Sequence, residues 1–598
     1  MPSQDRERRR KRNNRNRVGR TSLESEEETT EEPLYATVVY GSSPFNASFA
    51  PGEHVTSSNY TSTDNPRKII PWTIIRNDKR IILSLIVGIV VLLGLTAALA
   101  TALVMKTRNT QKGSNQRASL SNDIDANVST KTSSILTLES FLKSISMDGG
   151  LALQTTSSPQ YEAWKYLESR YNNTDNNNQN ISDYDNYWNS SLDKVMQVYA
   201  AHVLRFSIED DQGTMKDMNI DDECSWTYFS CNGGKQIVKV DMTSLSFSFS
   251  LPQEIVLLSS TLTELAIPYN NAYGTIPSNI WSNMSRLEKL NLDYNALSGT
   301  LPSELATLKS LTALDVNVNR IEGTIPSEFG LMYRLQHLSL VSNQITGTIP
   351  TELFSTDLRL IRLFLNNNSL QGTIPSEVGQ SFIEIFYVNE NMLTGTIPDE
   401  IYDSKIISDI TMEINNLTGT ISPKIGQLSQ LKNLRLCNNQ LDGSIPVELT
   451  YAIGLWGLCL GNNWLTGTLH TELGRLRYLD DLILGPNKFQ GTIPSHLGYL
   501  TDLSWNLDLS GNSFTGTIPS ELGSLTDLRY LHLDVNPYLR GTLPTELGNL
   551  RALEHMCASE SSVGGPVPSE LCELTQFNLT SLDINCNINC SCCTSCSE

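Results

Sequence analysis

A short phrase returns at a nearly constant interval through the second half of this chain. It reads IEGTIPSEFG at residues 321–330 and FTGTIPSELG at 514–523, and its first glycine recurs every 23–25 residues. A fixed period of this length predicts a solenoid, because one unit cannot bury its own apolar face and must stack on its neighbours. The glycines that mark the period are Gly274, Gly299, Gly323, Gly347, Gly372, Gly395, Gly419, Gly443, Gly467, Gly491, Gly516, Gly541 and Gly565.

A single unit indicates what each coil of the solenoid should contain. In LEKLNLDYNALSGTLPSELATL, residues 287–308, alternation places Leu290 and Leu292 inside and Asn291 outside, which predicts a short strand of a parallel sheet. The proline precedes a short helix, the next serine or threonine is placed to cap it, and the following glutamate suits the positive helix end. The capping positions are Ser303, Ser327, Thr351, Ser376, Ser520 and Thr545. We therefore expect an α/β solenoid of about 14 repeats, each of about 24 residues, around a curved parallel sheet.

One asparagine follows the strand in twelve consecutive units. Its amide carries two donors and an acceptor, so inside a stack it can satisfy the turning backbone of its own coil and of the adjacent coil. This role is structural rather than catalytic. The asparagines are Asn270, Asn295, Asn319, Asn343, Asn368, Asn391, Asn415, Asn439, Asn463, Asn487, Asn512 and Asn536.

An uncharged run of 24 residues, Ile81–Val104, precedes the repeats. As a helix it would extend roughly 36 Å, enough to cross a membrane. A basic run at 6–20 precedes it, whereas all 11 cysteines and nine glycosylation sequons follow it. We therefore expect a single-pass protein of the plasma membrane, with a cytosolic N-terminus and extracellular repeats. Eight of these nine asparagines are the predicted glycosylation sites: Asn127, Asn172, Asn180, Asn189, Asn283, Asn367, Asn416 and Asn578.

These features divide the chain into successive segments. They are a disordered cytosolic tail (1–80), a transmembrane signal-anchor helix (81–104), a stalk (105–158), a helical N-terminal cap containing Cys224 and Cys231 (159–235), the solenoid (236–584) and a cysteine-rich C-terminal cap (585–598). The caps are expected because the end units of a stack must cover a face that inner units bury against each other. In the cap, one helical face carries Val195, Tyr199, Val203 and Phe206.

The cysteines fall into three groups. Cys224 and Cys231 can close a short loop, and the tail CNINCSCCTSC with the preceding cysteine provides six more. A metal cluster is the alternative for the tail, but an oxidising compartment favours disulfides, whose pairing stays open. The predicted disulfide cysteines are Cys224, Cys231, Cys572, Cys586, Cys590, Cys592, Cys593 and Cys596.

Three cysteines are then left over: Cys437, Cys459 and Cys557. Cys437 and Cys459 lie on adjacent predicted strands but two positions out of register. About 4.8 Å between strands and about 6.7 Å along them place the Cα atoms roughly 8 Å apart, beyond the 7 Å limit for a disulfide. We therefore expect both to remain thiols.

The unit LxxLxxLxLxxNxLxGxIPxxLgxL resembles the leucine-rich repeat of plant receptor-like proteins, over Asp222–Cys596. CSWTYFSC resembles their paired-cysteine N-terminal cap. SPQYEAWKYLESR and the closing CNINCSCCTSC resemble segments of single-pass leucine-rich-repeat proteins of diatom algae. The resemblance implies a leucine-rich repeat solenoid that binds a ligand, and the N-terminal segment carries no kinase motif.

No catalytic motif is present: the seven histidines form no HExxH, and GxSxG, P-loop and kinase motifs are missing from the sequence. We expect no enzyme activity, no cofactor, no metal and, from the net charge of −20, no nucleic acid partner. Ligand binding should instead use residues that project from the strands, because aromatic and arginine side chains anchor interfaces. The candidates are Arg362, Phe364, Tyr387, Arg435, Trp456, Trp505, Tyr530 and His532.

Two functions fit this reading. The first is a cell-surface receptor-like protein that binds an extracellular protein, peptide or glycan and signals through a co-receptor or kinase partner. The alternative is a structural or adhesive wall-associated protein that does not signal.

Overall fold

The computed structural model describes residues 152–172, 192–208, 222–585 and 590–597, all within one compact unit, Asp123–Glu598. The predicted tail (1–80), the predicted membrane helix (81–104) and nearly all of the predicted stalk lie outside these ranges. Within the ranges, no helix has the length and apolar character that a membrane span requires.

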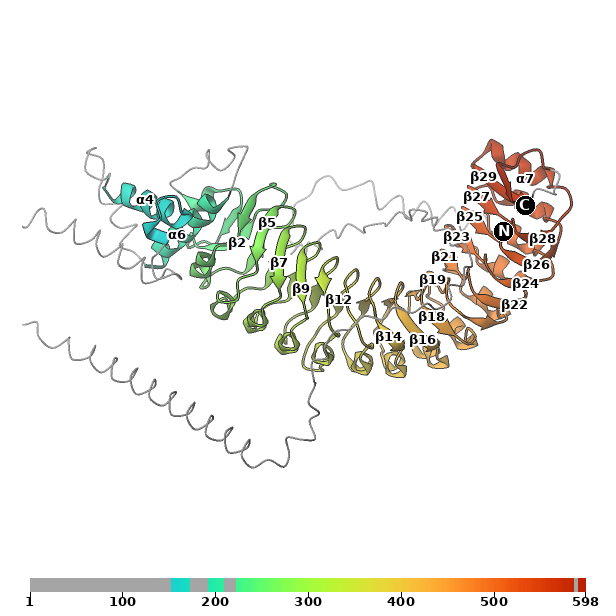
Figure 1. Ribbon diagram of the computed structural model, residues 1–598, viewed down its shortest axis with the longest axis horizontal. Helices are drawn as coiled ribbons and strands as arrows, with labels where there is room; N and C mark the ends of the chain where they lie inside the picture. The colour runs from blue at the N-terminus through green and yellow to red at the C-terminus, as the bar shows by residue number, and fades with distance from the viewer. Residues whose placement is uncertain (1–151, 173–191, 209–221, 586–589, 598) are drawn as a thin grey trace, which may run out of the picture. The chain divides into compact units, whose positions relative to one another are not determined.

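The main sheet has 17 strands, which follow one another along a curve from β2 to β29 (Figure 1). All neighbours pair in parallel except β1, which runs antiparallel to β2. The strands are β1 (Phe229–Cys231), β2 (Ile237–Asp241), β4 (Glu264–Ala266), β6 (Lys289–Asn291), β8 (Ala313–Asp315), β10 (His337–Ser339), β12 (Arg362–Phe364), β13 (Ile385–Tyr387), β15 (Asp409–Thr411), β17 (Asn433–Arg435), β19 (Gly457–Cys459), β21 (Asp481–Ile483), β23 (Asn506–Asp508), β25 (Tyr530–His532), β27 (His555–Cys557), β29 (Ser581–Asn585) and β30 (Ser595–Ser597).

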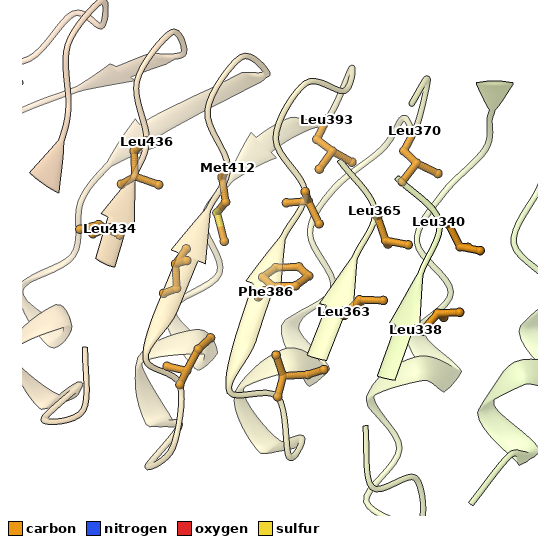
Figure 2. Packing of buried hydrophobic residues seen from close by; sticks show 14 of the residues in the cluster. Leu338, Leu340, Leu363, Leu365, Leu370, Phe386, Leu393, Met412, Leu434 and Leu436 are labelled. Carbon is orange, nitrogen blue, oxygen red and sulfur yellow. The ribbon is translucent and has the colours of Figure 1, made fainter. Parts of the chain in front are cut away.

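The central residue of each strand enters a continuous apolar core. Leu338, Leu363 and Phe386 lie in register on successive strands and are fully buried. Figure 2 shows them beside a second row in which Leu340 and Leu365 point into the same core. The predicted leucine-rich repeat solenoid with its parallel sheet is confirmed, because each coil buries its leucines against the next coil.

Each coil continues from the main sheet into a turn and a short 3-10 helix. The turns form additional parallel strands that the sequence analysis did not anticipate: β3 (Ser248–Ser250), β5 (Asn271–Thr275), β7 (Ala296–Thr300), β9 (Arg320–Gly323), β11 (Gln344–Ile345), β14 (Thr394–Thr396), β16 (Asn416–Thr420), β18 (Gln440–Asp442), β20 (Thr466–Gly467), β22 (Lys488–Thr492), β24 (Ser513–Thr515), β26 (Asn536–Gly541) and β28 (Ser561–Val563). The repeated glycine has a positive φ, 75° at Gly299, and an added Cβ there would lie 2.9 Å from Thr275 Cγ2. Glycine is therefore required at this turn.

The 3-10 helices lie on the opposite side of the coils from the main sheet (Figure 1). They are η7 (Trp281–Asn283), η8 (Ser303–Thr307), η9 (Ser327–Leu331), η10 (Thr351–Phe354), η11 (Ser376–Gln380), η12 (Asp399–Asp403), η13 (Pro423–Gln427), η14 (Val447–Tyr451), η15 (Thr471–Arg475), η16 (Ser495–Tyr499), η17 (Ser520–Ser524) and η18 (Thr545–Asn549), followed by α7 (Ser569–Glu573) and η19 (Leu574–Gln576).

The predicted capping of these helices by serine or threonine is wrong. The proline itself is the N-cap residue, with φ −73° and ψ 132° at Pro302, and Ser303 is already the first helical residue. From that position its hydroxyl makes no cap hydrogen bond; the same holds for η9, η10, η11, η17 and η18. Only where proline is shifted by one, in η13, does a serine cap: Ser422 Oγ accepts from the Lys424 N–H at 3.4 Å.

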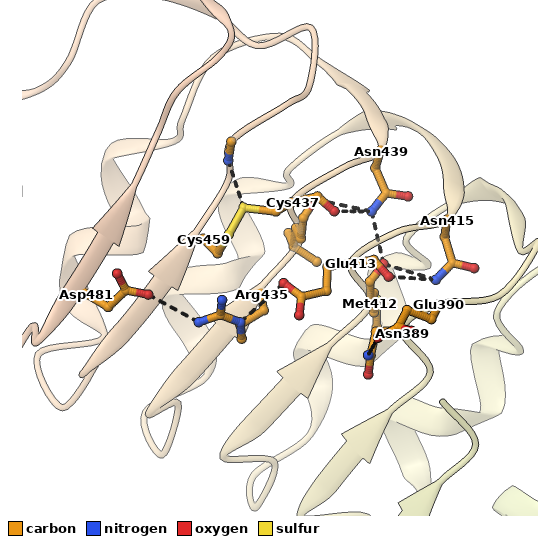
Figure 3. A network of polar contacts seen from close by, with 12 residues as sticks. Asn389, Glu390, Met412, Glu413, Asn415, Arg435, Cys437, Asn439, Cys459 and Asp481 are labelled. Atoms are coloured by element: carbon orange, nitrogen blue, oxygen red, sulfur yellow. Dashed lines mark hydrogen bonds and ion pairs between the residues drawn. A yellow bond between two sulfur atoms is a disulfide. The ribbon is translucent and has the colours of Figure 1, made fainter. Parts of the chain in front are cut away.

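The asparagine prediction is confirmed. The Asn415 amide nitrogen donates to Val388 O at 3.0 Å on the preceding coil and to Met412 O at 3.2 Å on its own coil. Its oxygen accepts from Leu393 N at 2.9 Å. Figure 3 shows the same arrangement one coil later at Asn439, so each of these asparagines ties its coil to the one before it.

Two α-helices, α4 (Pro159–Asn172) and α6 (Leu192–Ser207), precede the first coils, with η3 (Ala152–Gln154), η5 (Glu223–Ser225) and η6 (Gln253–Leu258) around them. The sequence predicted one buried stripe on α6, but the helix is buried on two sides. Tyr199 and Val203 pack in the cluster that includes α4, whereas Ala200 and Leu204 join the solenoid core. The reason is that α6 lies between α4 and the first coils.

The structure pairs most cysteines. Cys224 is bonded to Cys231, Cys572 to Cys592 and Cys590 to Cys593, with Cα separations of 5.7, 5.5 and 5.8 Å. Cys586 and the side chain of Cys596 lie outside the described part.

The prediction that Cys437 and Cys459 remain thiols is wrong, because they form a disulfide with Cα atoms 5.4 Å apart (Figure 3). Their register is as expected, since Cys459 pairs with Arg435. However, β17 ends at Arg435, and the chain turns through Asn438 at φ 57°. The expected Cα separation of Cys437 and Cys459 was therefore too long, because it treated the residues after Arg435 as extended strand.

Candidate ligand-binding face

The residues on either side of each buried central residue form the outer surface of the main sheet, here called the strand face. Arg362 and Phe364 flank the buried Leu363 in this way, the first exposed and the second half-buried. Trp456 and Trp505 come just before β19 and β23 and are 44% and 43% exposed. The eight predicted ligand-binding residues all belong to this face or to its edge, but the structure divides them into separate groups.

The first group is an aromatic cluster on β10, β12 and β13. Phe364 lies between His337 and Tyr387, with ring centroids 5.3 Å and 5.1 Å away. Arg362 is exposed on the same strand as Phe364, and no carboxylate of the described residues forms an ion pair with it. This part of the face can therefore offer a ligand both aromatic surface and a guanidinium group.

Beside this cluster lies an acidic pair, the buried Asp315 and the half-buried Asp293. Asp315 Oδ1 contacts His337 Nε2 at 2.7 Å, and Asp293 Oδ1 accepts from the Asn317 N–H. Burial, followed by the charge of Asp315, raises the pKa of Asp293 to about 7. Asp293 therefore changes charge near neutral pH, far above the usual range of an aspartate.

The second group is centred on Arg435. Its Nε lies 3.2 Å from Glu413 Oε2 and its Nη1 lies 3.2 Å from Asp481 Oδ2 (Figure 3). Asp481 is two strands away from Arg435. On the intervening strand β19, the residue in register with Asp481 is Gly457, so no side chain at that position separates the guanidinium from the carboxylate. Burial raises the pKa of Asp481 to about 6, although Arg435 opposes the shift. Arg435 thus stabilises the face internally, and its charge is already shared between two carboxylates.

The third group is a second aromatic cluster near the end of the solenoid. Tyr530 lies between Trp505, at a centroid distance of 5.3 Å, and His555, which stacks on it at 5.2 Å. The Arg529 guanidinium lies 4.8 Å from the Trp505 ring, and Glu554 accepts from both Arg529 Nε and Tyr530 Oη. The cluster is therefore a preorganised surface.

Sequence reasoning missed His337, Glu554 and His555. The signal was available, because His555 occupies the same strand position as Tyr530, one period later. Trp456 stands apart from both clusters. Among the described residues no ring or charged group pairs with it, and its backbone is held by hydrogen bonds to Lys432 O and from Asp480 N.

His532 belongs to a different neighbourhood. It lies in register with Asp508 on β23 and with Cys557 on β27. Cys557 is a free thiol whose Sγ lies 3.6 Å from Asp583 Oδ2. Burial and the nearby carboxylates of Asp534 and Asp583 raise the pKa of the Cys557 thiol to about 12.

Four predicted glycosylation sites are exposed on the solenoid: Asn283, Asn367, Asn416 and Asn578. Asn172 ends α4, and the other three lie outside the described part. Exposure is what an acceptor asparagine requires, and their modification stays a prediction.

An open groove of about 960 Å³ lies away from the strand face, beside the 3-10 helices of the early coils. Its lining includes residues of the repeated threonine-to-proline turns, together with Asn279, Ser303 and Glu328. None of the predicted binding residues contributes to it, so the groove follows from the stacking of turns.

Comparisons with known proteins agree with this fold. The family model described as Leucine rich repeat matches residues 260–321, and a second, Leucine Rich Repeat, matches 334–355, 359–381, 430–451 and 505–525. The leucine-rich repeat protein LIC12759 of Leptospira interrogans is 30% identical, with 57% of this chain and 84% of that chain covered and a TM-score of 0.48. The chain belongs to the leucine-rich repeat proteins.

Receptors are among the similar structures. A TDR receptor is 29% identical over 59% of this leucine-rich repeat protein and 64% of the receptor chain, with a TM-score of 0.54. The plant peptide hormone receptor RGFR1, in complex with RGF2, is 28% identical over 61% and 68%, with a TM-score of 0.43. This leucine-rich repeat protein spans just under two thirds of the TDR receptor chain. No curated protein matches the sequence. The predicted plant-type repeat family is confirmed, whereas the resemblance of the flanking segments to diatom proteins stays a prediction.

Proposed function

We propose that this leucine-rich repeat protein is a cell-surface receptor-like protein. Its strand face would bind an extracellular protein, peptide or glycan, and the signal would pass through a co-receptor or kinase partner. The observation that carries the proposal is the pair of half-exposed tryptophans, Trp456 and Trp505, at the edge of one sheet. The similarity to the structure of a TDR receptor also supports a receptor-like function.

The two tryptophans are well placed to anchor one ligand. Backbone hydrogen bonds run from Asp480 N to Trp456 O and from Trp505 N to Asp480 O, so the tryptophans are two strands apart. At about 4.8 Å per strand, their backbones are roughly 10 Å apart. An extended peptide or a short glycan could therefore contact both.

Exposed tryptophan is costly in water unless a partner covers it, and it is the residue type most enriched at binding hot spots. Trp505 is already oriented by Arg529 and Tyr530, so it loses little conformational entropy on binding. Arg435, by contrast, would have to break two ion pairs to reach a ligand. We therefore assign the anchoring role to Trp456 and Trp505 rather than to Arg435.

Location at the cell surface is part of the proposal. It rests on the predicted anchor at 81–104, on the basic run before it, and on the disulfides after it, which form in oxidising compartments. Protease added to intact cells should remove the chain from about Lys106 onward and leave an N-terminal tag protected. Cleavage of the tag with protected repeats would reverse this topology.

The binding test uses full-length protein purified from its native cells in detergent, with and without medium conditioned by the same cells. We expect a membrane partner to co-purify in a medium-dependent way. Loss of one buried aromatic anchor typically costs about 2 kcal/mol, a thirtyfold loss in affinity. The Trp456→Ala, Trp505→Ala double variant should therefore lose the partner.

The matched control is Glu328→Ala, which changes an exposed residue of η9 on the opposite side of the coil. It should bind as well as wild type. Equal binding by the double tryptophan variant would contradict the assignment of the anchors. Recovery of insoluble wall polymer alone, with no membrane partner under either condition, would favour the adhesive alternative.

A further inference from the structure

Four consecutive strands carry potential metal ligands at one shared position. Asp508 on β23, His532 on β25, Cys557 on β27 and Asp583 on β29 are paired in register. Because side chains at the same register position leave a parallel sheet on the same face, the four form one row across neighbouring strands about 4.8 Å apart.

Three side chains of this neighbourhood come closer still. One ligand atom each of His532, Asp534 and Cys557 lie within 4.8 Å of one another. His532 Nδ1 is 3.9 Å from Asp534 Oδ1, and Cys557 Sγ is 3.6 Å from Asp583 Oδ2. In a tetrahedral zinc site, bonds of about 2.0–2.3 Å separate the ligand atoms by about 3.5 Å. Small side-chain rotations would therefore bring these groups to ligand distance.

A second observation points to a missing cationic partner. Asp534 Oδ1 is buried and accepts no hydrogen bond from the described residues. Buried polar atoms of this kind normally have a partner. The surrounding row adds the carboxylates of Asp508 and Asp583, and no lysine or arginine of the described residues forms an ion pair with any of the three.

The thiol also stands out among the cysteines. Eight cysteines of the described part are joined in disulfides, and Cys557 is free although it is only half-buried. A thiolate bound to a metal is protected from oxidation by that bond, which would explain why a thiol persists beside so many disulfides.

We propose that His532, Asp534 and Cys557 bind one divalent transition-metal ion of the zinc class, with Asp583 as the fourth ligand. Imidazole and thiolate ligands select such an ion over magnesium or calcium, which prefer oxygen ligands only. Binding replaces the thiol proton, which is released to water, and the ion brings two positive charges to the acidic row.

The site would join the last coils to one another. Its ligands come from β25, from the turn after β25, from β27 and from β29, so one ion links three consecutive coils near the C-terminal end of the stack. It also adjoins the aromatic cluster, because His532 is on the same strand as Tyr530. The proposal is independent of the receptor function.

The test uses full-length protein in detergent, purified without reductant, stripped with EDTA and then titrated with Zn²⁺ or Co²⁺. Wild type should bind one tight ion per chain by metal analysis, and Co²⁺ should give the intense absorption of thiolate-to-cobalt charge transfer. Cys557→Ser should abolish that absorption. His532→Asn and Asp534→Asn should weaken Zn²⁺ binding by about a hundredfold or more, since even loss of an outer-shell partner costs about 10–100-fold.

The matched control is His496→Asn, which removes an exposed histidine of η16 and should bind Zn²⁺ as wild type does. Equal unfolding temperatures of the variants in EDTA will show that the substitutions leave the metal-free fold intact. The proposal is overturned if all variants bind the same amount of Zn²⁺, or if Co²⁺ gives no charge-transfer band in wild type. It is also overturned if Cys557 in freshly isolated protein is found in a mixed disulfide.

Discussion

Replacing Asn415 with alanine tests how the repeated asparagine stabilises the solenoid. The side chain is 8% exposed and makes four hydrogen bonds to backbone groups. If all four groups lost their only partner, the cost would be several times the roughly 1–3 kcal/mol of one unsatisfied buried group. The structure predicts a smaller cost, because the four groups are not equally dependent on Asn415.

Each carbonyl that accepts from Asn415 keeps another donor. These remaining hydrogen bonds are Asn391 Nδ2 to Val388 O at 3.2 Å, Asn439 Nδ2 to Met412 O at 3.0 Å, and Glu390 N to Glu413 O at 2.9 Å. Only the Leu393 N–H, which donates to Asn415 Oδ1, loses its partner. One unsatisfied N–H at about 2 kcal/mol and three weakened carbonyls at about 0.5 kcal/mol each give about 3.5 kcal/mol.

The assay is urea unfolding followed by tryptophan fluorescence, together with amide hydrogen exchange of the native protein. We expect Asn415→Ala to lower the free energy of unfolding by about 3.5 kcal/mol and to accelerate exchange most strongly at Leu393. Asn279→Ala is the control, because Asn279 is an exposed asparagine that bonds only to the Gln253 side chain. A cost below about 1 kcal/mol, or one above about 6 kcal/mol, would refute this accounting.

Two further substitutions test single contacts. Asp293→Asn should leave stability unchanged near pH 4 and raise it by up to about 4 kcal/mol at pH 8. The reason is that a folded-state pKa of about 7, against an ordinary 3.8, makes wild type lose stability as the pH rises from about 4 to about 7. A stability difference between variant and wild type that does not change with pH in urea unfolding would contradict this. Gly379→Ala should lower the free energy of unfolding by about 3 kcal/mol or more, because the new Cβ would lie 1.7 Å from Glu400 O. In the control, Gly564→Ala, the new Cβ meets no atom within 4 Å, so this variant should unfold at the wild-type temperature.

The sequence alone was sufficient for the features that each repeat specifies locally. The alternation around Leu290 predicted a strand, and the structure has β6 there with Leu290 buried. The recurring asparagine predicted its own hydrogen bonds, because an amide beside a turn in a stack has few other partners. Aromatic residues such as Trp456 and Trp505 could be selected as exposed because their positions in the repeat are known.

Features that depend on contacts between coils needed the tertiary structure. The Cys437–Cys459 disulfide forms because the chain turns directly after Arg435, and a repeat pattern does not say where a strand ends. The Arg435–Asp481 pair forms across Gly457, a residue whose small size mattered only once its neighbours were known.

The same reason separates the clusters of the strand face. Residues 23–25 positions apart become neighbours only through the register of the sheet, so His532 and Cys557 are distant in the chain and adjacent in space. The sequence thus determined what each coil is, since that depends on short-range pattern. Only the stacking of coils decided which side chains meet, because those contacts depend on the register, the turns and the size of intervening residues.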